Sequence, residues 1–185
     1  MALMSNRPVR VMLDANVMID AYCCWHSEGF AAKNFLGSCD PDNVELYYPV
    51  HVLKDVLYVL TQEFKREARR VEGNLGESSA LSARETAIAC MRNMMELATA
   101  VGADGSDLWL ADKYLPIHHD FEDNLVLAAC RRIKADYLVT NDLTLIQNAN
   151  VLAKTPAQMM ELMNIGKLQA SDGLTSGEIP WTFRS

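Results

Sequence analysis

The sequence predicts an α/β domain with a central parallel sheet covered by helices on both faces, a three-layer α/β/α arrangement. Short β-rich segments alternate along the chain with longer segments of helical periodicity, which is typical of a parallel sheet. Half of the 185 residues are hydrophobic, enough for one sizeable core. The chain contains neither internal repeats nor low-complexity segments. We expect one domain over residues 1–165, followed by a weakly patterned C-terminal tail over 166–185.

Strands are expected where short β-rich runs end in turn-forming residues. The first run is Val9–Leu13 (VRVML), and the second, VELYYPV at 44–50, ends near Pro49. The run DYLVT at 136–140 is followed by an Asn-Asp turn, and the pair at 151–152 suggests a last short strand.

Helices are expected between these strands, from the spacing of apolar residues and from end signals such as Pro156 at a first helical position. The helix at 120–134 has acidic residues in its first turn and basic residues in its last, which suits the helix dipole. The expected helices are 15–25, 27–36, 51–71, 82–101, 106–115, 120–134, 143–148 and 156–164.

Composition narrows the class of protein. The chain has 17 basic and 24 acidic residues and a net charge of -7, which argues against nucleic-acid binding through bulk charge alone. The five cysteines form no C-x-x-C pair, which favours a reduced cytoplasmic protein. The N-terminus does not resemble a signal peptide, and no apolar run approaches the ~18 residues of a membrane span, so we expect no membrane association.

Acidic side chains follow two of the expected strands at the point where each strand ends. Asp14 comes directly after the first strand, and Asp142 comes just after 136–140. Because ligands bind beyond the carboxyl ends of parallel strands, these residues belong to the edge of the sheet where a site is expected. Asp55, early in the helix after the second strand, and Asp123, in the first turn of the helix at 120–134, can reach the same cleft.

Carboxylates about 4 Å apart repel one another, so such a cluster is stable only when it is protonated or binds a cation. Oxygen ligands favour Mg²⁺ or Mn²⁺, and no Cys or His spacing resembles a zinc site. Each acid also has a structural interpretation: Asp14 and Asp123 as helix-capping or first-turn acids, Asp142 as an Asx turn, and Asp55 on a solvated face. The occurrence of all four together favours the metal site.

Four segments of the chain resemble the PIN-domain nucleases. They are VMLDANVMIDAY at 11–22, VLKDVLYVL at 52–60, DFEDNLVLAA at 120–129 and DYLVTNDLTLI at 136–146. Each string alone is a weak signal, but their order, spacing and expected elements together match the family from residue 9 to about residue 163.

The resemblance implies a PIN-like domain that hydrolyses RNA phosphodiester bonds as a Mg²⁺- or Mn²⁺-dependent endoribonuclease. Many such proteins are toxins of toxin–antitoxin pairs, which implies an antitoxin partner. A metal-assisted reaction needs no histidine base, and a bound cation lets an acidic chain hold an anionic substrate. The family usually has Glu as its second acid, so the shorter Asp55 is expected to reach the metal directly or through water. The implied metal-binding and catalytic residues are Asp14, Asp55, Asp123 and Asp142, with Asn16 and Thr140 as supporting polar groups.

Two other functions stay open. Asp55 in place of Glu is compatible with a non-catalytic PIN-like module that binds RNA or protein. Phosphatases of the haloacid dehalogenase type also have an Asp after the first strand, but they require a second Asp where Asn16 stands. Because Asn serves as neither acid nor base, this reading is disfavoured.

Some residues outside these motifs also carry expectations. His118 and His119 are interpreted as surface or turn residues. The basic run at 65–70 (KREARR) is either a solvated face or a contact for RNA phosphates. Methionine-rich helices, together with Trp181 in the tail, favour a homodimer or a surface for an antitoxin.

Overall fold

The computed structural model of the protein describes residues 7–116 and 118–171, with the side chains described as far as residue 164. The expectations for Trp181 and for the tail beyond residue 171 lie outside the described residues. Five parallel strands form one sheet in the order β3-β2-β1-β4-β5. The strands are β1 (Val9–Leu13), β2 (Val44–Pro49), β3 (Thr99–Val101), β4 (Tyr137–Val139) and β5 (Ala153–Lys154).

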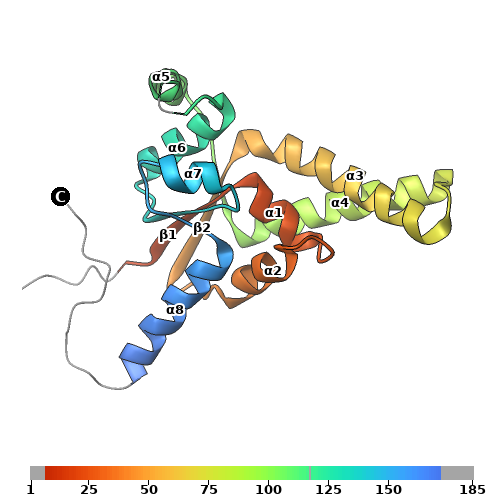
Figure 1. Ribbon diagram of the computed structural model, residues 1–185, viewed down its shortest axis with the longest axis horizontal. Coiled ribbons are helices and arrows are strands. Elements are labelled where there is room, and N and C mark those ends of the chain that lie inside the picture. Colours follow the sequence, from red (N-terminus) through yellow and green to blue (C-terminus); the bar gives the residue numbers. More distant parts are fainter. Residues whose placement is uncertain (1–6, 117, 172–185) are drawn as a thin grey trace, which may run out of the picture.

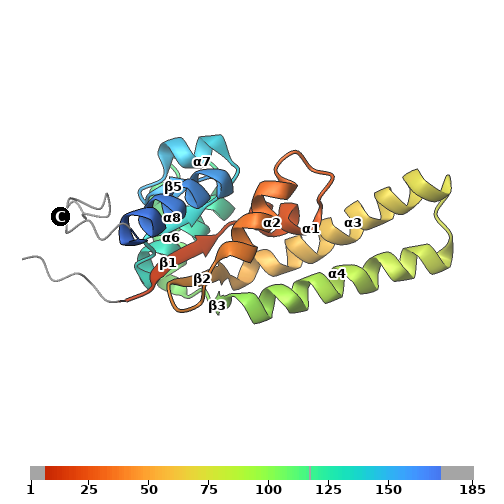
Figure 2. The same cartoon turned by 90° about the horizontal axis from the view of Figure 1, so that it is seen from below.

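Helices connect consecutive strands and cover the sheet, so the expected three-layer parallel α/β fold is confirmed. In Figures 1 and 2, α2 and α8 lie side by side on one side of the sheet, and α6 lies on the other. None of the helices in the described part of the chain is long and apolar enough to cross a membrane. The helices are α1 (Ala15–Tyr22), α2 (Gly29–Ser38), the 3₁₀ turn η1 (Val50–Val52), α3 (Leu53–Glu72), α4 (Glu77–Leu97), α5 (Gly105–Tyr114), α6 (Phe121–Ile133), α7 (Leu143–Asn148) and α8 (Pro156–Ser171).

The order of the strands fixes where a site can form. From β1 the chain proceeds outward to β2 and β3, and it then returns to the other side of β1 to form β4 and β5. In sheets of this kind, ligands bind at the point where the strand order reverses, beyond the carboxyl ends of the strands. Here that point lies between β1 and β4, where Leu13 is in register with Val139 and the backbone N–H of Asp14 donates to the carbonyl oxygen of Val139 (3.0 Å).

Helices α3 and α4 form a long antiparallel hairpin that projects away from the sheet (Figures 1 and 2). The basic run at 65–70 lies in the outer half of α3. Arg66 pairs with Glu63 and Arg70 with Glu67 on the same helix, so two of its four cations are already compensated. This arrangement favours the solvated-face interpretation of the run over a contact for RNA phosphates.

Several element boundaries differ from the expectation. The helix expected at 82–101 ends at Leu97, and the next residues form β3, which pairs with β2. Three residues are too few to give a strand periodicity, so the apolar pattern of the preceding helix conceals this strand. The last strand lies at Ala153–Lys154 rather than at 151–152. Helix α8 continues to Ser171, beyond the expected helix end at 164. It also passes the expected domain boundary at 165, and that boundary stays a prediction.

The first helix is also shorter than expected and ends at Tyr22. The N–H of Cys23 bonds to the carbonyl oxygens of Ile19 and Asp20, and the chain then turns into α2. At Gly29 a Cβ atom would overlap the carbonyl oxygen of Cys23, so this turn requires glycine.

Candidate active site

Asp14 stands where β1 ends, and it is the N-cap of α1. Its Oδ1 accepts a hydrogen bond from the N–H of Ala15 (2.6 Å), and its Oδ2 accepts from Asn16 Nδ2 (2.7 Å) and the Thr140 hydroxyl (2.6 Å). The residue is only 6% exposed. The capping interpretation of Asp14 is therefore correct. The same contacts fix the carboxylate at the carboxyl edge of the sheet.

Asn16 and Thr140 join the ends of β1 and β4 around this carboxylate. Asn16 Nδ2 also donates to Thr140 Oγ1 (3.1 Å), and Asn16 Oδ1 accepts from the N–H of Asn141 (3.0 Å). The Thr140 hydroxyl accepts from the N–H of Asp142 (3.0 Å) while it donates to Asp14. Both residues predicted as supporting groups thus contact Asp14, and their part in a reaction stays a prediction.

Asp142 is the N-cap of α7. Its Oδ1 accepts hydrogen bonds from the N–H groups of Thr144 (2.7 Å) and Leu145 (3.1 Å). Its Oδ2 accepts no hydrogen bond from the residues that the structure describes. Because its N–H binds Thr140, the position of Asp142 is tied to that of Asp14 through one hydroxyl group.

Asp123 lies in the first turn of α6, but it does not cap that helix. The N-cap is Asp120, whose Oδ1 accepts from the N–H groups of Glu122 (2.9 Å) and Asp123 (3.3 Å). The carboxylate of Asp123 instead has Oδ2 2.8 Å from His118 Nε2. Its side chain therefore has a partner outside the helix and retains one oxygen for another ligand.

Both histidines were expected to be surface or turn residues, and both lie in the loop before α6, but only His119 is at the surface. His118 is 8% exposed and is held against Asp123, whereas His119 is exposed. The carbonyl oxygen of His118 accepts from the buried Asn124 side chain (2.7 Å), which folds this segment back onto α6. A contact of this kind depends on the path of the loop, and the adjacent pair in the sequence gives no sign of it.

The three aspartates at positions 14, 123 and 142 influence one another electrostatically. Burial and, to a smaller extent, the charges of Asp123 and Asp142 raise the pKa of Asp14 to about 6, against the lowering effect of the hydrogen bonds from the Thr140 hydroxyl and the Ala15 N–H. Burial also raises the pKa of Asp123, helped by Asp120 and Asp142 and opposed by the hydrogen bond from His118. Mutual repulsion of this kind is relieved by a cation bound between the carboxylates.

Asp55 is more exposed than Asp14 and interacts less with the other acids of this cluster. Its side chain is 46% exposed and pairs with Lys54 Nζ (3.0 Å). Its charge acts on His51, whose pKa is lowered mainly by burial and is raised in opposition by Glu122 and Asp55. The start of α3 therefore lies near the start of α6, but Asp55 is not among the leading influences on Asp14 or Asp123.

The donor chemistry of the cluster fits a hard divalent cation. The candidate ligands are carboxylate oxygens, which Mg²⁺ and Mn²⁺ prefer. Within the described residues, no three His, Cys, Asp or Glu side chains are grouped closely enough to hold a metal ion together. Mg²⁺ usually keeps several waters and uses only one or two protein carboxylates, so the arrangement suits that ion better than one that needs a full set of protein ligands.

A second polar network behind the site was missed by the sequence analysis. Asn141 Nδ2 donates to Asp20 Oδ2 (2.8 Å), and Asp20 Oδ1 lies 2.7 Å from His26 Nδ1. His26 Nε2 is 3.4 Å from Oε2 of the buried Glu63, which connects the edge of the sheet to α3. Asp20 follows Asn16 by one helical turn, so the spacing on α1 was a signal that could have identified it.

The chain is similar to known proteins both in its fold and in its sequence. The structure of VapBC2 from Rickettsia felis, bound to a DNA fragment from its promoter, has a TM-score of 0.54 at 12% identity and covers 80% of this chain and 98% of that chain. VapC20 of Mycobacterium tuberculosis, described as a toxin that cleaves the sarcin–ricin loop, has a TM-score of 0.48 at 17% identity, covering 69% and 86%. The comparison with curated proteins gave no match. The family model of the PIN domain matches residues 10–144, which confirms the resemblance seen in the sequence: the chain belongs to the PIN domain family.

Proposed function

We propose that this protein is a metal-dependent endoribonuclease and the toxin component of a toxin–antitoxin pair in the cytoplasm. The observation that carries the proposal is the cluster of Asp14, Asp123 and Asp142, whose charges repel one another at the point where the strand order reverses. Membership of the PIN domain family supports nuclease activity. The toxin role and an antitoxin partner rest on the family resemblance.

In this proposal Asp14, Asp123 and Asp142 hold Mg²⁺ or Mn²⁺, with Asp55 contributing through water. When bound, the ion supplies positive charge against the phosphodiester and makes a nearby water more acidic. The protein's own contribution is orientation. Thr140 and Asn16 fix the carboxylate of Asp14.

Two further contacts orient the rest of the cluster. His118 holds one oxygen of Asp123, and the capping bonds of Asp142 all fall on Oδ1, which leaves Oδ2 to face a ligand. Carboxylates fixed in advance in this way lose little side-chain entropy when the cation and the RNA bind.

The test is cleavage of an unstructured RNA as a function of Mg²⁺ and Mn²⁺ concentration. Asp123→Asn should abolish cleavage, because it keeps the shape of the side chain and removes its charge. Asp120→Asn is the matched control, since it lies one turn earlier on the same element and Asn caps a helix as well as Asp does. Full activity in Asp123→Asn would overturn the proposal.

The same assay separates the two rival functions. A rise in melting temperature on adding Mn²⁺, without any RNA cleavage, would favour the non-catalytic PIN-like module. Asp55 gives that module some support, because it is half-exposed and already paired with Lys54. Hydrolysis of a generic phosphomonoester, with no cleavage of RNA, would favour the phosphatase.

A homodimer is also proposed, although the structure alters the reasons for it. Of the methionines that motivated it, Met94 and Met159 are buried in the core, whereas Met95 is 53% exposed. Leu81, on the same side of this helix as Met95, is also exposed, so α4 keeps apolar residues that a second copy or an antitoxin can cover. Sedimentation at micromolar concentration tests the dimer, and a monomer would count against it.

A further inference from the structure

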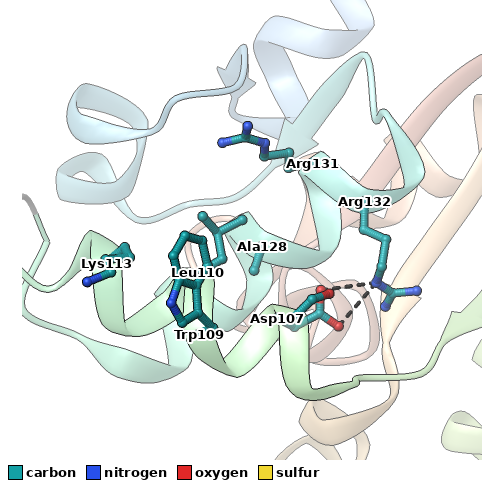
Figure 3. A pocket seen from close by; sticks show the side chains of 8 residues that line it. Asp107, Trp109, Leu110, Lys113, Ala128, Arg131 and Arg132 are labelled. Carbon is teal, nitrogen blue, oxygen red and sulfur yellow. Dashed lines mark hydrogen bonds and ion pairs between the residues drawn. The ribbon is translucent and has the colours of Figure 1, made fainter.

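An open groove of about 500 Å³ lies between α5 and α6 (Figure 3). Its apolar lining includes Trp109, Leu110 and Ala128, and its cationic lining includes Lys113 and Arg131. The volume is in the range of ~300–1,000 Å³ that is typical of ligand sites. None of the residues predicted for the acidic site lines this groove.

Trp109 is the aromatic side chain that lines the groove. The residue is 63% exposed, although it carries a large apolar ring. Lys113 follows it by one helical turn, and Lys113 Nζ lies 5.7 Å from the centroid of the indole ring. A cation near an aromatic face places a positive charge beside a surface on which a planar ring can stack.

The cationic side chains of the groove differ in whether an acidic side chain neutralises their charge. Arg132 Nε bonds to both carboxylate oxygens of Asp107 (3.0 and 3.1 Å), and its guanidinium also donates to the Gly102 carbonyl oxygen. Lys113 and Arg131 take part in no ion pair within the part of the chain that the structure describes. The chain as a whole has a net charge of -7, so two cations without an acidic partner give this groove a local positive charge. A positive charge beside an exposed indole favours the binding of a polyanion.

We propose that the groove between α5 and α6 binds single-stranded RNA, with one base stacked on Trp109 and the adjoining phosphates at Lys113 and Arg131. Alternating bases and phosphates match this combination of an aromatic face and nearby cations. Duplex RNA does not fit, because its bases are already stacked and their faces are covered.

The proposal rests on the proposed function, because α6 connects the groove to the acidic cluster. Asp123 lies in the first turn of α6, and Arg131 lies about two turns farther on, or about 12 Å along the helix axis. The segment that joins α5 to α6 carries His118, which contacts Asp123. A strand held in the groove therefore lies within a few nucleotides of the acidic cluster, and the groove selects substrates with unpaired bases.

The test measures the binding of a fluorescently labelled, unstructured RNA by anisotropy in EDTA, so that cleavage does not interfere. Trp109→Ala should weaken binding about 5- to 150-fold, the loss expected for one stacked base. Trp109→Phe keeps an aromatic face and should restore most of the affinity. A duplex of the same sequence should bind both Trp109 variants and the wild type equally.

A charge variant tests the phosphate contacts independently of the aromatic ring. Arg131→Ala should reduce the slope of log affinity against log salt concentration by about 0.7, the value for one lost phosphate contact on a single strand. Arg84→Ala is the matched control, because Arg84 is exposed on the projecting helix α4, away from the groove. It should leave both the affinity and the slope unchanged.

Three results for the Trp109→Ala variant would overturn the inference. The first is an RNA affinity within twofold of wild type. The second is a loss of binding to an acidic peptide such as polyglutamate that equals its loss of RNA binding, and the third is a change from dimer to monomer on sedimentation. The second would assign the groove to a protein partner, and the third to contact between two copies of the chain. Failure of the proposed function would give a different result from failure of this inference. A wild-type protein that binds RNA through Trp109 but never cleaves it would refute the nuclease activity and still support RNA binding in the groove.

Discussion

Replacing Asp14 by Asn should stabilise the metal-free protein at neutral and higher pH. Burial, with the charges of Asp123 and Asp142, raises the pKa of Asp14 from its ordinary value of 3.8 to about 6. A difference of about two pKa units corresponds to about 3 kcal/mol. Because the pKa rises on folding, the folded state binds this proton more tightly than the unfolded state. The resulting stability is fully present below about pH 4 and is lost as the pH rises through about 6.

Asn does not ionise, so the variant escapes this loss, but its amide has only one acceptor oxygen. That oxygen can accept from Asn16 and Thr140, as Oδ2 of Asp14 does. The N–H of Ala15, which now bonds to Oδ1, then loses its acceptor at a cost of about 1 kcal/mol. The net expectation is a gain of about 2 kcal/mol above pH 7, and no gain at pH 4, where Asp14 of the wild type is protonated.

The assay is urea unfolding in EDTA at pH 4 and pH 8, supported by thermal melts, in which 1 kcal/mol corresponds to about 2–4 °C. Asp120→Asn, an exposed cap that Asn can replace, should change little at either pH. Adding Mn²⁺ should stabilise the wild type and not Asp14→Asn, because only the wild type retains the ligand. If Asp14→Asn is less stable than the wild type at pH 8, the hydrogen bonds outweigh the charge and the reasoning is refuted.

Three further predictions concern other residues in and around the candidate active site. Thr140→Val removes the hydroxyl that bonds Asp14 and should cost about 1–3 kcal/mol in urea unfolding, whereas Thr140→Ser should restore most of it. His118→Gln should lower kcat for RNA cleavage without abolishing it, because it loosens Asp123 and leaves its charge in place; unchanged kcat would contradict this role. Asp55→Glu should lower the Mn²⁺ concentration that gives half-maximal cleavage, since Asp55 is 46% exposed and a longer acid has room, and a higher concentration would indicate crowding.

The layer architecture and the edge that carries the site could be predicted because their signals are local. Each of the strands β1 and β4 is a short β-rich run that is followed directly by a polar residue, and the alternation of strands with helices implies a parallel sheet. Those features place Asp14 and Asp142 at one edge, where the structure has them coupled through Thr140. The strand β3 could not be predicted, because three residues at the end of a helix carry no period of their own.

Contacts that depend on the path of a loop or on the packing of two helices account for the rest of what was missed. His118 meets Asp123 only because Pro116 ends α5 and the following loop folds back onto α6. His26 meets Asp20 and Glu63 only because α1 and α3 pack together. A periodic pattern identifies the buried face of one helix, but it does not say which polar side chains of two helices will meet.

The capping and metal-binding interpretations of the acids are not alternatives in this fold. Three helices, α1, α6 and α7, begin at the carboxyl edge, and their N-termini carry partial positive charge. Those N-termini stabilise Asp14, Asp123 and Asp142 as anions, which lowers the cost of keeping like charges close together before a cation arrives. A cap uses one oxygen, as at Asp142, and leaves the other for a ligand. At Asp142, substitution by Asn separates the two roles, because Asn keeps the cap and removes the charge, so that loss of RNA cleavage without loss of helix stability identifies this residue as a metal ligand.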